Sequence, residues 1–273
     1  MANTISSRTY RDVLRKESFQ EYTKMALVAK EIAMEDTSGD KVIQNPYSSQ
    51  PTPSVGAITG TYTVSDFTTT DESLSVADQV TIAERINDFE ELLTKPNLFL
   101  DRTDKMTNAI AEEIDKYILD KLATGAGNTN VSVAGGFTST NVIPTLASIV
   151  GELAGYSNFK LNGAYIVIGN SAVPAFIQAQ IGNGFMMSDL AIKNGLFTNH
   201  AGVNIYVVRD DQLPTNTVIA GISKQATWAN PGGLRVQEKP VPLATATEVV
   251  YFAYIGAKVW SETADLTMNI STA

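Results

Sequence analysis

The chain of 273 residues has no cysteine and one histidine, His200. Without cysteine it can form no disulfide, thiolate metal site, redox pair or cysteine nucleophile. One histidine excludes most zinc sites and most histidine-based catalysis, unless that residue alone supplies them. His200 stands between Thr198-Asn199 and Ala201-Gly202. That setting predicts an ordinary histidine in a loop.

Long apolar runs and excess positive charge are also missing. The longest nearly apolar stretch, residues 249–260, includes Lys258 and is too short to cross a bilayer. We interpret it as one long buried strand or a strand pair. Residues 1–14 are polar and show no apolar run of the signal-peptide type. The net charge of −9 predicts a surface that repels polyphosphate and anionic membranes, which disfavours sequence-specific nucleic-acid binding.

Motifs for catalysis are absent as well. The sequence has no phosphate loop, dinucleotide fingerprint, nucleophile elbow or metalloprotease helix. Neighbouring helical residues such as Glu112 and Glu113 point about 100° apart, so they cannot converge as a general acid and base. The pair Asp210-Asp211 favours a turn, and Trp228 and Trp260 favour packing in a core or interface. We therefore predict no enzyme activity and no catalytic, cofactor or metal residue.

The first third of the chain predicts elements that extend from a body. Apolar residues at steps of three and four from Tyr10 to Ala33 predict an amphipathic helix. Residues 36–54 show neither helical nor strand periodicity, so we interpret them as a linker, and the helix need not pack on its own domain. Alternating apolar residues over 55–86 predict a two-stranded ribbon, which is marginal in isolation and needs a surface to lie on. The plainer alternative is that the ribbon extends a sheet of its own domain.

The rest of the sequence predicts a long helix followed by alternating helices and strands. Apolar residues step by four along residues 96–122, and Thr124-Gly125 ends this helix. At 1.5 Å per residue such a helix spans roughly 40 Å, which suggests a strut. Further helices are predicted over 144–154, 171–179 and 223–229, and strands over 164–168, 204–208, 218–221, 234–238, 249–260 and 266–270.

The order of these elements resembles the Hong Kong 97-like major capsid proteins of tailed bacteriophages over essentially the whole chain. The resemblance lies in the arm, the acidic ribbon and a series of short segments in matching order. These segments are residues 75–80, 87–90, 194–197, 201–208 with Leu213-Pro214, 219–221, 224–226 and 254–260.

The resemblance implies an α+β fold with an N-terminal arm, an extended β-hairpin called the E-loop, a peripheral domain with a long spine helix, and an axial α/β domain. The implied limits are 1–35 for the arm and 36–86 for the linker and E-loop. They are 87–140 with 234–261 for the peripheral domain, and 141–233 with 262–273 for the axial domain.

The same resemblance implies self-assembly through hexamers and pentamers into an icosahedral shell enclosing double-stranded DNA. The expected partners are other copies of the chain, a separate scaffolding protein, a portal, cement proteins and non-specifically held DNA, with no membrane. The expected location is the virion, after assembly in the host cytoplasm. Some members cross-link a ribbon lysine to a neighbour's asparagine. Because no lysine lies between Lys41 and Lys95, we expect a non-covalent shell.

Two other functions stay open at this stage. One is an encapsulin-like nanocompartment, which shares the architecture and holds protein cargo. The other is a cytosolic α/β enzyme that uses Asp210, Asp211 or His200. Under the capsid interpretation, the apolar residues of the arm and ribbon are the candidates for contacts between subunits: Tyr22, Met25, Ile58, Tyr62, Val64, Leu74, Val76, Val80 and Ile82.

Overall fold

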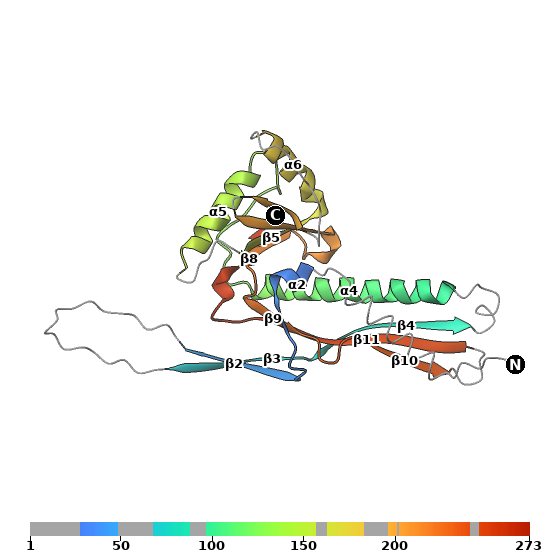
Figure 1. Ribbon diagram of the computed structural model, residues 1–273. Coiled ribbons are helices and arrows are strands. Elements are labelled where there is room, and N and C mark those ends of the chain that lie inside the picture. Colours follow the sequence, from blue (N-terminus) through green and yellow to red (C-terminus); the bar gives the residue numbers. More distant parts are fainter. Residues whose placement is uncertain are drawn as a thin grey trace.

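The structure is a computed structural model that describes residues 28–48, 68–87, 97–156, 163–182, 196–200, 202–240 and 246–273. Two sheets form the body, one on each side of the long helix α4 (Asn97–Gly125), and a narrow hairpin projects from one end (Figure 1). No helix among the described residues is long and apolar enough to cross a membrane.

The predicted strut is confirmed as α4. Its apolar residues recur every four positions, so they share one face of the helix, and that face is buried. Charged residues such as Glu112 and Glu113 lie on the opposite, exposed face. The helix ends at Gly125, as the sequence predicts. The buried stripe consists of Met106, Ile110, Ile114, Ile118 and Leu122.

The first sheet is organised around β11 (Ala246–Val259), a single strand as one of the two interpretations predicted. Strands β10 (Arg235–Pro240) and β4 (Asp78–Asn87) pair antiparallel with the same stretch of β11, so they flank it on opposite sides. Farther along, β9 (Ala226–Ala229) pairs antiparallel with β11, and β1 (Met34–Asp36) pairs parallel with β9. Alternate β11 residues, from Val249 to Ile255, are buried in one cluster with the α4 stripe.

The second sheet has the order β12–β8–β5–β7–β6. Its central strand β5 (Ala164–Gly169) is buried throughout and pairs parallel with β7 (Val203–Val208) and antiparallel with β8 (Thr217–Ile222). Strand β12 (Thr267–Ser271) pairs with β8, and β6 (Leu196–His200) pairs with β7. The described part of the body also includes the short 3-10 helices η1 (Asn170–Ala172), η2 (Asp210–Gln212) and η3 (Ala264–Leu266).

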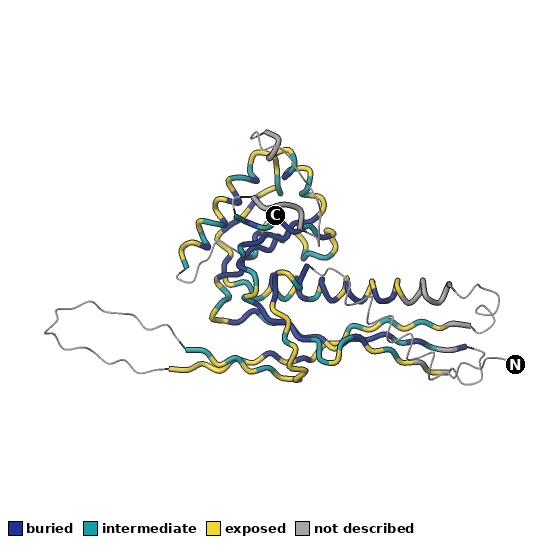
Figure 2. The backbone as a smooth tube through the Cα atoms, in the orientation of Figure 1, coloured by how far each residue is buried: buried dark blue, intermediate teal, exposed yellow. Residues whose placement is uncertain are grey.

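Strand β5 divides two cores. Because side chains alternate along a strand, Tyr165 and Val167 lie in the cluster with α4, while Ile166 and Ile168 lie in a second cluster. Helices α5 (Val142–Ala154) and α6 (Val173–Gly182) complete that second cluster on the far side of the sheet. Figure 2 shows the resulting continuous band of buried backbone from the β5 sheet down to β11.

Two predictions in the C-terminal half are wrong. Residues 223–229 were predicted as helix, but Ala226–Ala229 form the buried strand β9, because pairing with β11 outweighs the local helix propensity. His200 was predicted in a loop, but it is the last residue of strand β6. The sequence Thr-Asn-His has no apolar alternation that would reveal a strand at the edge of a sheet.

The predicted linker and ribbon also differ from the structure. Residues 36–54 were interpreted as having no regular structure, yet β2 (Val42–Ser48) lies within them and pairs antiparallel with β3 (Thr69–Ser75). The hairpin therefore consists of β2 and β3, while β4 joins β11 instead of a ribbon. Pro46 and the polar residues of β2 hide the strand, and proline is tolerated because β2 has a free edge among the described strands.

The predicted independence of the N-terminal helix is wrong for its last turn. Helix α2 (Val28–Ile32) buries Val28, Ala29 and Ile32 in the same cluster as α4. Ala33 follows in that cluster, and β1 begins at the next residue. The earlier residues of the predicted helix lie outside the described residues.

Gly256 permits the chain between β3 and β4 to cross directly over β11. A Cβ atom at Gly256 would lie 2.9 Å from the Ser75 carbonyl oxygen and 3.1 Å from Val76 Cα. We predict that Gly256→Ala lowers the free energy of unfolding by about 1–3 kcal/mol, because backbone must shift to admit the methyl group. Urea denaturation followed by tryptophan fluorescence measures this change.

Gly151 provides the matched control, since a Cβ atom there would meet nothing within 4 Å on the exposed side of α5. Gly151→Ala should stabilise the chain by up to about 1 kcal/mol. Equal effects of the two substitutions would contradict the proposed close approach at Gly256.

Candidate functional site

The hairpin of β2 and β3 is the most exposed regular element among the described residues (Figures 1 and 2). These strands form a two-stranded sheet of their own, so each keeps one edge without a partner strand in the described part of the chain. Val42, Gln44 and Pro46 of β2 and Asp71 and Ser73 of β3 share its exposed face. Because a two-stranded sheet is marginally stable in water, this element needs a surface to cover it.

A small apolar cluster fastens the hairpin to the body. Leu74 and Val76 are buried against Ala229 and Trp260, and Ile43 of β2 packs against this cluster. The indole Nε1 of Trp260 donates a hydrogen bond of 2.8 Å to Thr227 Oγ1, which satisfies its polar atom inside the cluster. This cluster therefore anchors the base of the hairpin to the body.

An ion pair beside this cluster fixes the hairpin to β11. Glu72 Oε1 lies 2.9 Å from Lys258 Nζ, and the two side chains are 15% and 30% exposed. The backbone N–H and the hydroxyl of Ser261 donate to the same carboxylate at 2.9 and 3.0 Å. Lys258 Nζ also donates to the Ser73 carbonyl oxygen at 2.9 Å and lies 5.4 Å from the centre of the Trp260 ring.

The protonation of Glu72 follows from these contacts. Burial alone raises the pKa of this carboxyl, but the hydrogen bonds from Lys258 and Ser261 together outweigh burial and hold the pKa below its usual value. A lowered pKa means that Glu72 stabilises the fold above its usual pKa and loses that effect as the pH falls through the lower value. The clamp is thus intact at neutral pH.

The structure separates the nine predicted contact residues into two groups. Leu74 and Val76 are buried at the base of the hairpin, and Val80 and Ile82 of β4 pack against the α4 cluster. Leu74 and Val76 are thus buried by Ala229 and Trp260, and Val80 and Ile82 are half-buried because β4 joins β11. The other five, Tyr22, Met25, Ile58, Tyr62 and Val64, lie outside the described residues, so their contacts stay predictions.

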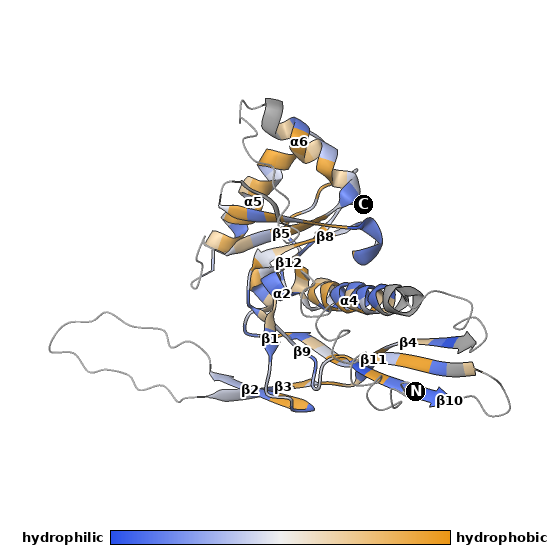
Figure 3. Ribbon diagram, turned by 45° about the vertical axis from the view of Figure 1, so that its right-hand side comes forward, coloured by the Kyte–Doolittle hydropathy of each residue, from blue (hydrophilic) through white to orange (hydrophobic). Residues whose placement is uncertain are grey.

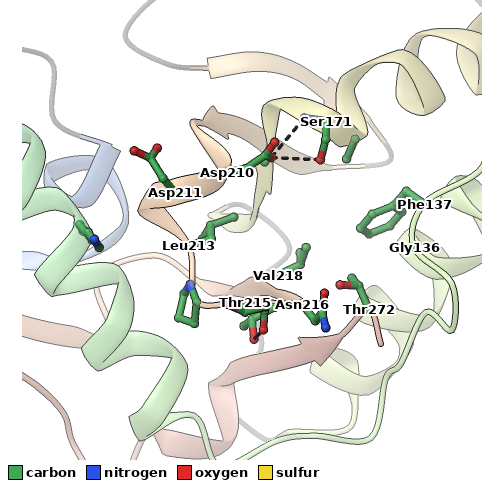
Figure 4. A pocket seen from close by; sticks show the side chains of 15 residues that line it. Gly136, Phe137, Ser171, Asp210, Asp211, Leu213, Thr215, Asn216, Val218 and Thr272 are labelled. Carbon is green, nitrogen blue, oxygen red and sulfur yellow. Dashed lines mark hydrogen bonds between the residues drawn. The ribbon is translucent and has the colours of Figure 1, made fainter.

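The acidic pair Asp210-Asp211 lies beside an open cleft of about 790 Å³ between α4 and the β5 sheet. Asp210 Oδ1 accepts hydrogen bonds from the backbone N–H and hydroxyl of Ser171 at 3.2 and 3.0 Å. Figure 4 shows Asp210 turned toward Ser171 and Asp211 pointing away from it. Arg209 binds Asp211 at 2.8 Å and reaches Glu112 of α4 at 3.1 Å.

These contacts give both aspartates structural roles. They belong to η2, so the predicted turn is confirmed, and the two carboxylates do not converge on one point of the cleft. Arg209 lowers the pKa of Asp211 through its hydrogen bond, which favours the ionised form. Among the described residues, no group of three or more His, Asp or Glu side chains could hold a metal ion.

Both tryptophans pack inside the body, as predicted. Trp228 is fully buried on β9 in the α4 cluster, and Trp260 is 7% exposed at the hairpin base. Both tryptophans therefore serve packing, at the α4 cluster and at the hairpin base.

Searches against protein-family models and against curated sequences return no match. The fold, in contrast, is similar to those of many solved structures. A structure from Mycobacterium phage Che8 superposes with a TM-score of 0.68 at 14% identity, covering 85% of this chain and 84% of that one. The capsid of cyanophage P-SCSP1u gives 0.68 at 16% identity, covering 89% and 86%.

A virus-like particle from Pyrococcus furiosus is also similar, with a TM-score of 0.60 at 10% identity over 96% of this chain and 99% of that one. The α+β fold of Hong Kong 97-like capsid proteins, expected from the sequence, is therefore confirmed. At these identities the comparison establishes the fold.

The ion pair at the hairpin base leads to a prediction about coupling energy. A double-mutant cycle with Glu72→Gln and Lys258→Met should give a coupling of roughly 1 kcal/mol in the free energy of unfolding, because both partners are largely buried. The exposed pair Arg85–Glu248, at 2.8 Å with side chains 59% and 40% exposed, is the matched control, because it also joins a neighbouring strand (β4) to β11. Its cycle should give less than about 0.5 kcal/mol.

Urea denaturation of the four variants in each cycle measures both couplings. Hydrogen exchange of residues 70–76 should accelerate in the Glu72 and Lys258 variants and stay unchanged in the control variants. Equal couplings for the two pairs would show that the clamp adds nothing beyond an ordinary surface contact.

Proposed function

We propose that this chain is the major capsid protein of a tailed bacteriophage. Copies of it assemble through hexamers and pentamers into an icosahedral shell that encloses double-stranded DNA. The observation that carries this proposal is the agreement in fold, over more than four-fifths of both chains, with a phage capsid structure. The projecting hairpin supports it, because a free two-stranded element suits a contact with a neighbouring copy.

In the proposed shell, the hairpin of each copy lies on the next copy of the ring and the N-terminal segment passes beneath adjacent copies. Permanent interfaces of this kind bury on the order of 2,000–5,000 Å² per pair. Tyr22, Met25, Ile58, Tyr62 and Val64 are the proposed contacts, since they precede or connect the anchored strands. Leu74, Val76, Val80 and Ile82 instead support the hairpin and the β11 sheet from within.

The charge of the chain suits a container for DNA. A net charge of −9 disfavours tight binding of the polyphosphate backbone, so packaged DNA would be held without specific contacts. The proposed location is the virion, with assembly in the host cytoplasm. A separate scaffolding protein, a portal and cement proteins are the proposed partners, and no enzymatic step is assigned to the chain.

Assembly provides the direct test. We expect purified protein to elute in the void volume of a sizing column and to form closed shells in negatively stained electron micrographs. Boiling in detergent should return the shells to one band of monomer size, because the segment between Lys41 and Lys95 has no lysine for a cross-link. Ile58→Asp should abolish shells by placing a charge in the proposed interface.

The matched control is Ile58→Val, which keeps an apolar side chain and should keep the shells. A chain that stays monomeric at all concentrations would overturn the proposal. Such a result would favour the alternative of a soluble enzyme, for which Asp210, Asp211 and His200 would then be the residues to substitute.

A protein-filled compartment is the second candidate, favoured by the similarity to the virus-like particle from Pyrococcus furiosus over nearly the whole of both chains. The contents of particles purified from the native source distinguish the two. After external nuclease treatment, DNA-filled shells should absorb most strongly at 260 nm, whereas protein-filled shells should absorb most strongly at 280 nm. Protein-filled particles would replace the DNA proposal and leave the shell proposal standing.

A further inference from the structure

The face of the β11 sheet that points away from α4 is exposed on its three strands. Side chains alternate along a strand, so Tyr251 and Ala253 lie in the α4 cluster while Phe252 and Tyr254 point to the other face. The register of β10 and β4 places further side chains on that face. The exposed ones are Arg235, Gln237 and Lys239 of β10 and Gln79, Thr81, Ala83 and Arg85 of β4.

This face is positively charged, although the chain as a whole has a net charge of −9. Its described side chains include three cations and one carboxylate, that of Glu248. Glu248 binds Arg85 at 2.8 Å and lies opposite Lys239 in the strand register. Arg235 lies opposite Phe252 instead and has no acidic partner among the described residues. Arg235 is therefore the uncompensated charge of the face.

Arg235 forms a defined pair with Tyr254. Its guanidinium carbon lies 5.5 Å from the centre of the Tyr254 ring, and Phe252 packs edge-on against the same ring with 5.6 Å between ring centres. Tyr254 is 38% exposed, and with Met34 and Val42 it is one of the exposed large apolar side chains among the described residues. Arginine and tyrosine are enriched at the positions that dominate binding energy in protein interfaces. The pair thus has the composition of an interface centre.

The hairpin of β2 and β3 displays a pair of the complementary kind. Asp71 of β3 lies directly opposite Pro46 of β2, and both side chains are exposed. Asp71 has no cationic partner among the described residues. Side chains opposite each other on antiparallel strands have Cβ atoms about 5 Å apart. The hairpin therefore presents a carboxylate beside an apolar ring, at a spacing close to that between the Arg235 guanidinium and the Tyr254 ring.

The hairpin and Arg235 lie toward opposite ends of β11 (Figure 1). Strand β3 meets β11 at Lys258, and Asp71 lies farther out along the hairpin than Ser73, which Lys258 binds. Arg235 lies on β10, which pairs with residues 247–252 of β11. Because its base is fixed at Lys258, the hairpin cannot reach the Arg235 of its own chain. A contact between the two pairs must join different copies head to tail, an arrangement that closes into rings.

We propose that the Arg235–Tyr254 pair is the docking site for the hairpin of a second copy. Asp71 of the incoming hairpin forms an ion pair with Arg235, and Pro46 packs on the exposed ring of Tyr254. Charge complementarity supports this occupant, since an uncompensated cation on one surface meets an uncompensated carboxylate on the other. The proposal rests on the proposed shell function and names the residues through which one copy receives the next.

Reversal of the two charges tests the docking site. Asp71→Arg and Arg235→Asp should each raise the protein concentration needed for assembly at least about tenfold, because like charges then face each other. The double variant restores opposite charges and should assemble within about threefold of the unsubstituted concentration. Light scattering against protein concentration measures the threshold, and circular dichroism checks that each variant is folded.

The matched controls keep each charge. Asp71→Glu and Arg235→Lys should assemble at nearly the unsubstituted concentration. Assembly of the two reversed variants at that concentration would overturn the docking site. A double variant that assembles no better than either single one would overturn it as well, since the two side chains would then act independently.

Chemical cross-linking provides a test that needs no loss of assembly. A carbodiimide joins a carboxylate to a nearby amine, so it should link Asp71 to the lysine introduced by Arg235→Lys. Particles of that variant assembled from equal amounts of unlabelled and nitrogen-15-labelled copies should yield this linked peptide with one light and one heavy half. Unsubstituted particles, with no amine at position 235, should not yield it. Failure to detect the mixed peptide in the variant would overturn the docking site.

The outcomes for docking and for the shell are separate. Closed shells in electron micrographs without the mixed peptide or the charge rescue would refute the docking site and leave the shell proposal standing. The mixed peptide in open rings or small oligomers, with no closed shells at any concentration, would support the docking site and refute the shell.

Discussion

The burial of one face of α4 is the constraint on which the rest of the structure depends. A single stripe of apolar residues, from Met106 to Leu122, belongs to one cluster with β11 below it and with Tyr165 and Val167 of β5 above it. The helix therefore joins the two sheets into one body, and a polar residue in this stripe would separate them. Figure 3 shows that the ribbon of β11, which runs below the helix, is coloured largely as hydrophobic residues. Helix α2 completes the same cluster, which explains why the first described segment is part of the body.

The two extensions of this body are stabilised in different ways. The hairpin is attached by four buried side chains and the clamp of Glu72, Lys258 and Ser261, while its exposed face has both apolar residues, such as Val42, and polar ones. The N-terminal segment is attached by α2, where Asp115 and Lys224 supply the charges that a short helix needs at its ends. Both attachments combine apolar contacts with charged groups, at the hairpin through Glu72 and Lys258 and at α2 through Asp115 and Lys224.

The elements that were predicted correctly are those whose periodicity arises from burial on one face. The four-residue steps in α4 and the apolar runs of β5 and β11 record contacts with the core, so they can be read without knowing the partner. Strand β2 could not be found in this way, because it has one partner strand, an exposed face and a proline. The sequence of strand β9 was predicted as helix, because its strand conformation depends on pairing with the end of β11, about thirty residues later in the chain. The Glu72 clamp joins residues 186 positions apart in the sequence, and no local pattern reveals such a pair.

The sequence resemblance and the structure both single out the hairpin of β2 and β3. The apolar residues predicted to contact other copies were chosen because they seemed unable to bury themselves, yet Leu74, Val76, Val80 and Ile82 are covered by the chain's own β11 and Trp260. Within the described part of the chain, the uncovered surface of the hairpin is therefore narrower than the sequence suggests: it consists of the free edges and exposed face of the hairpin rather than its apolar residues nearest the body. The described body folds around α4, and the hairpin is anchored to it at the base. The clamp at the base of the hairpin sets the direction in which the hairpin leaves the body.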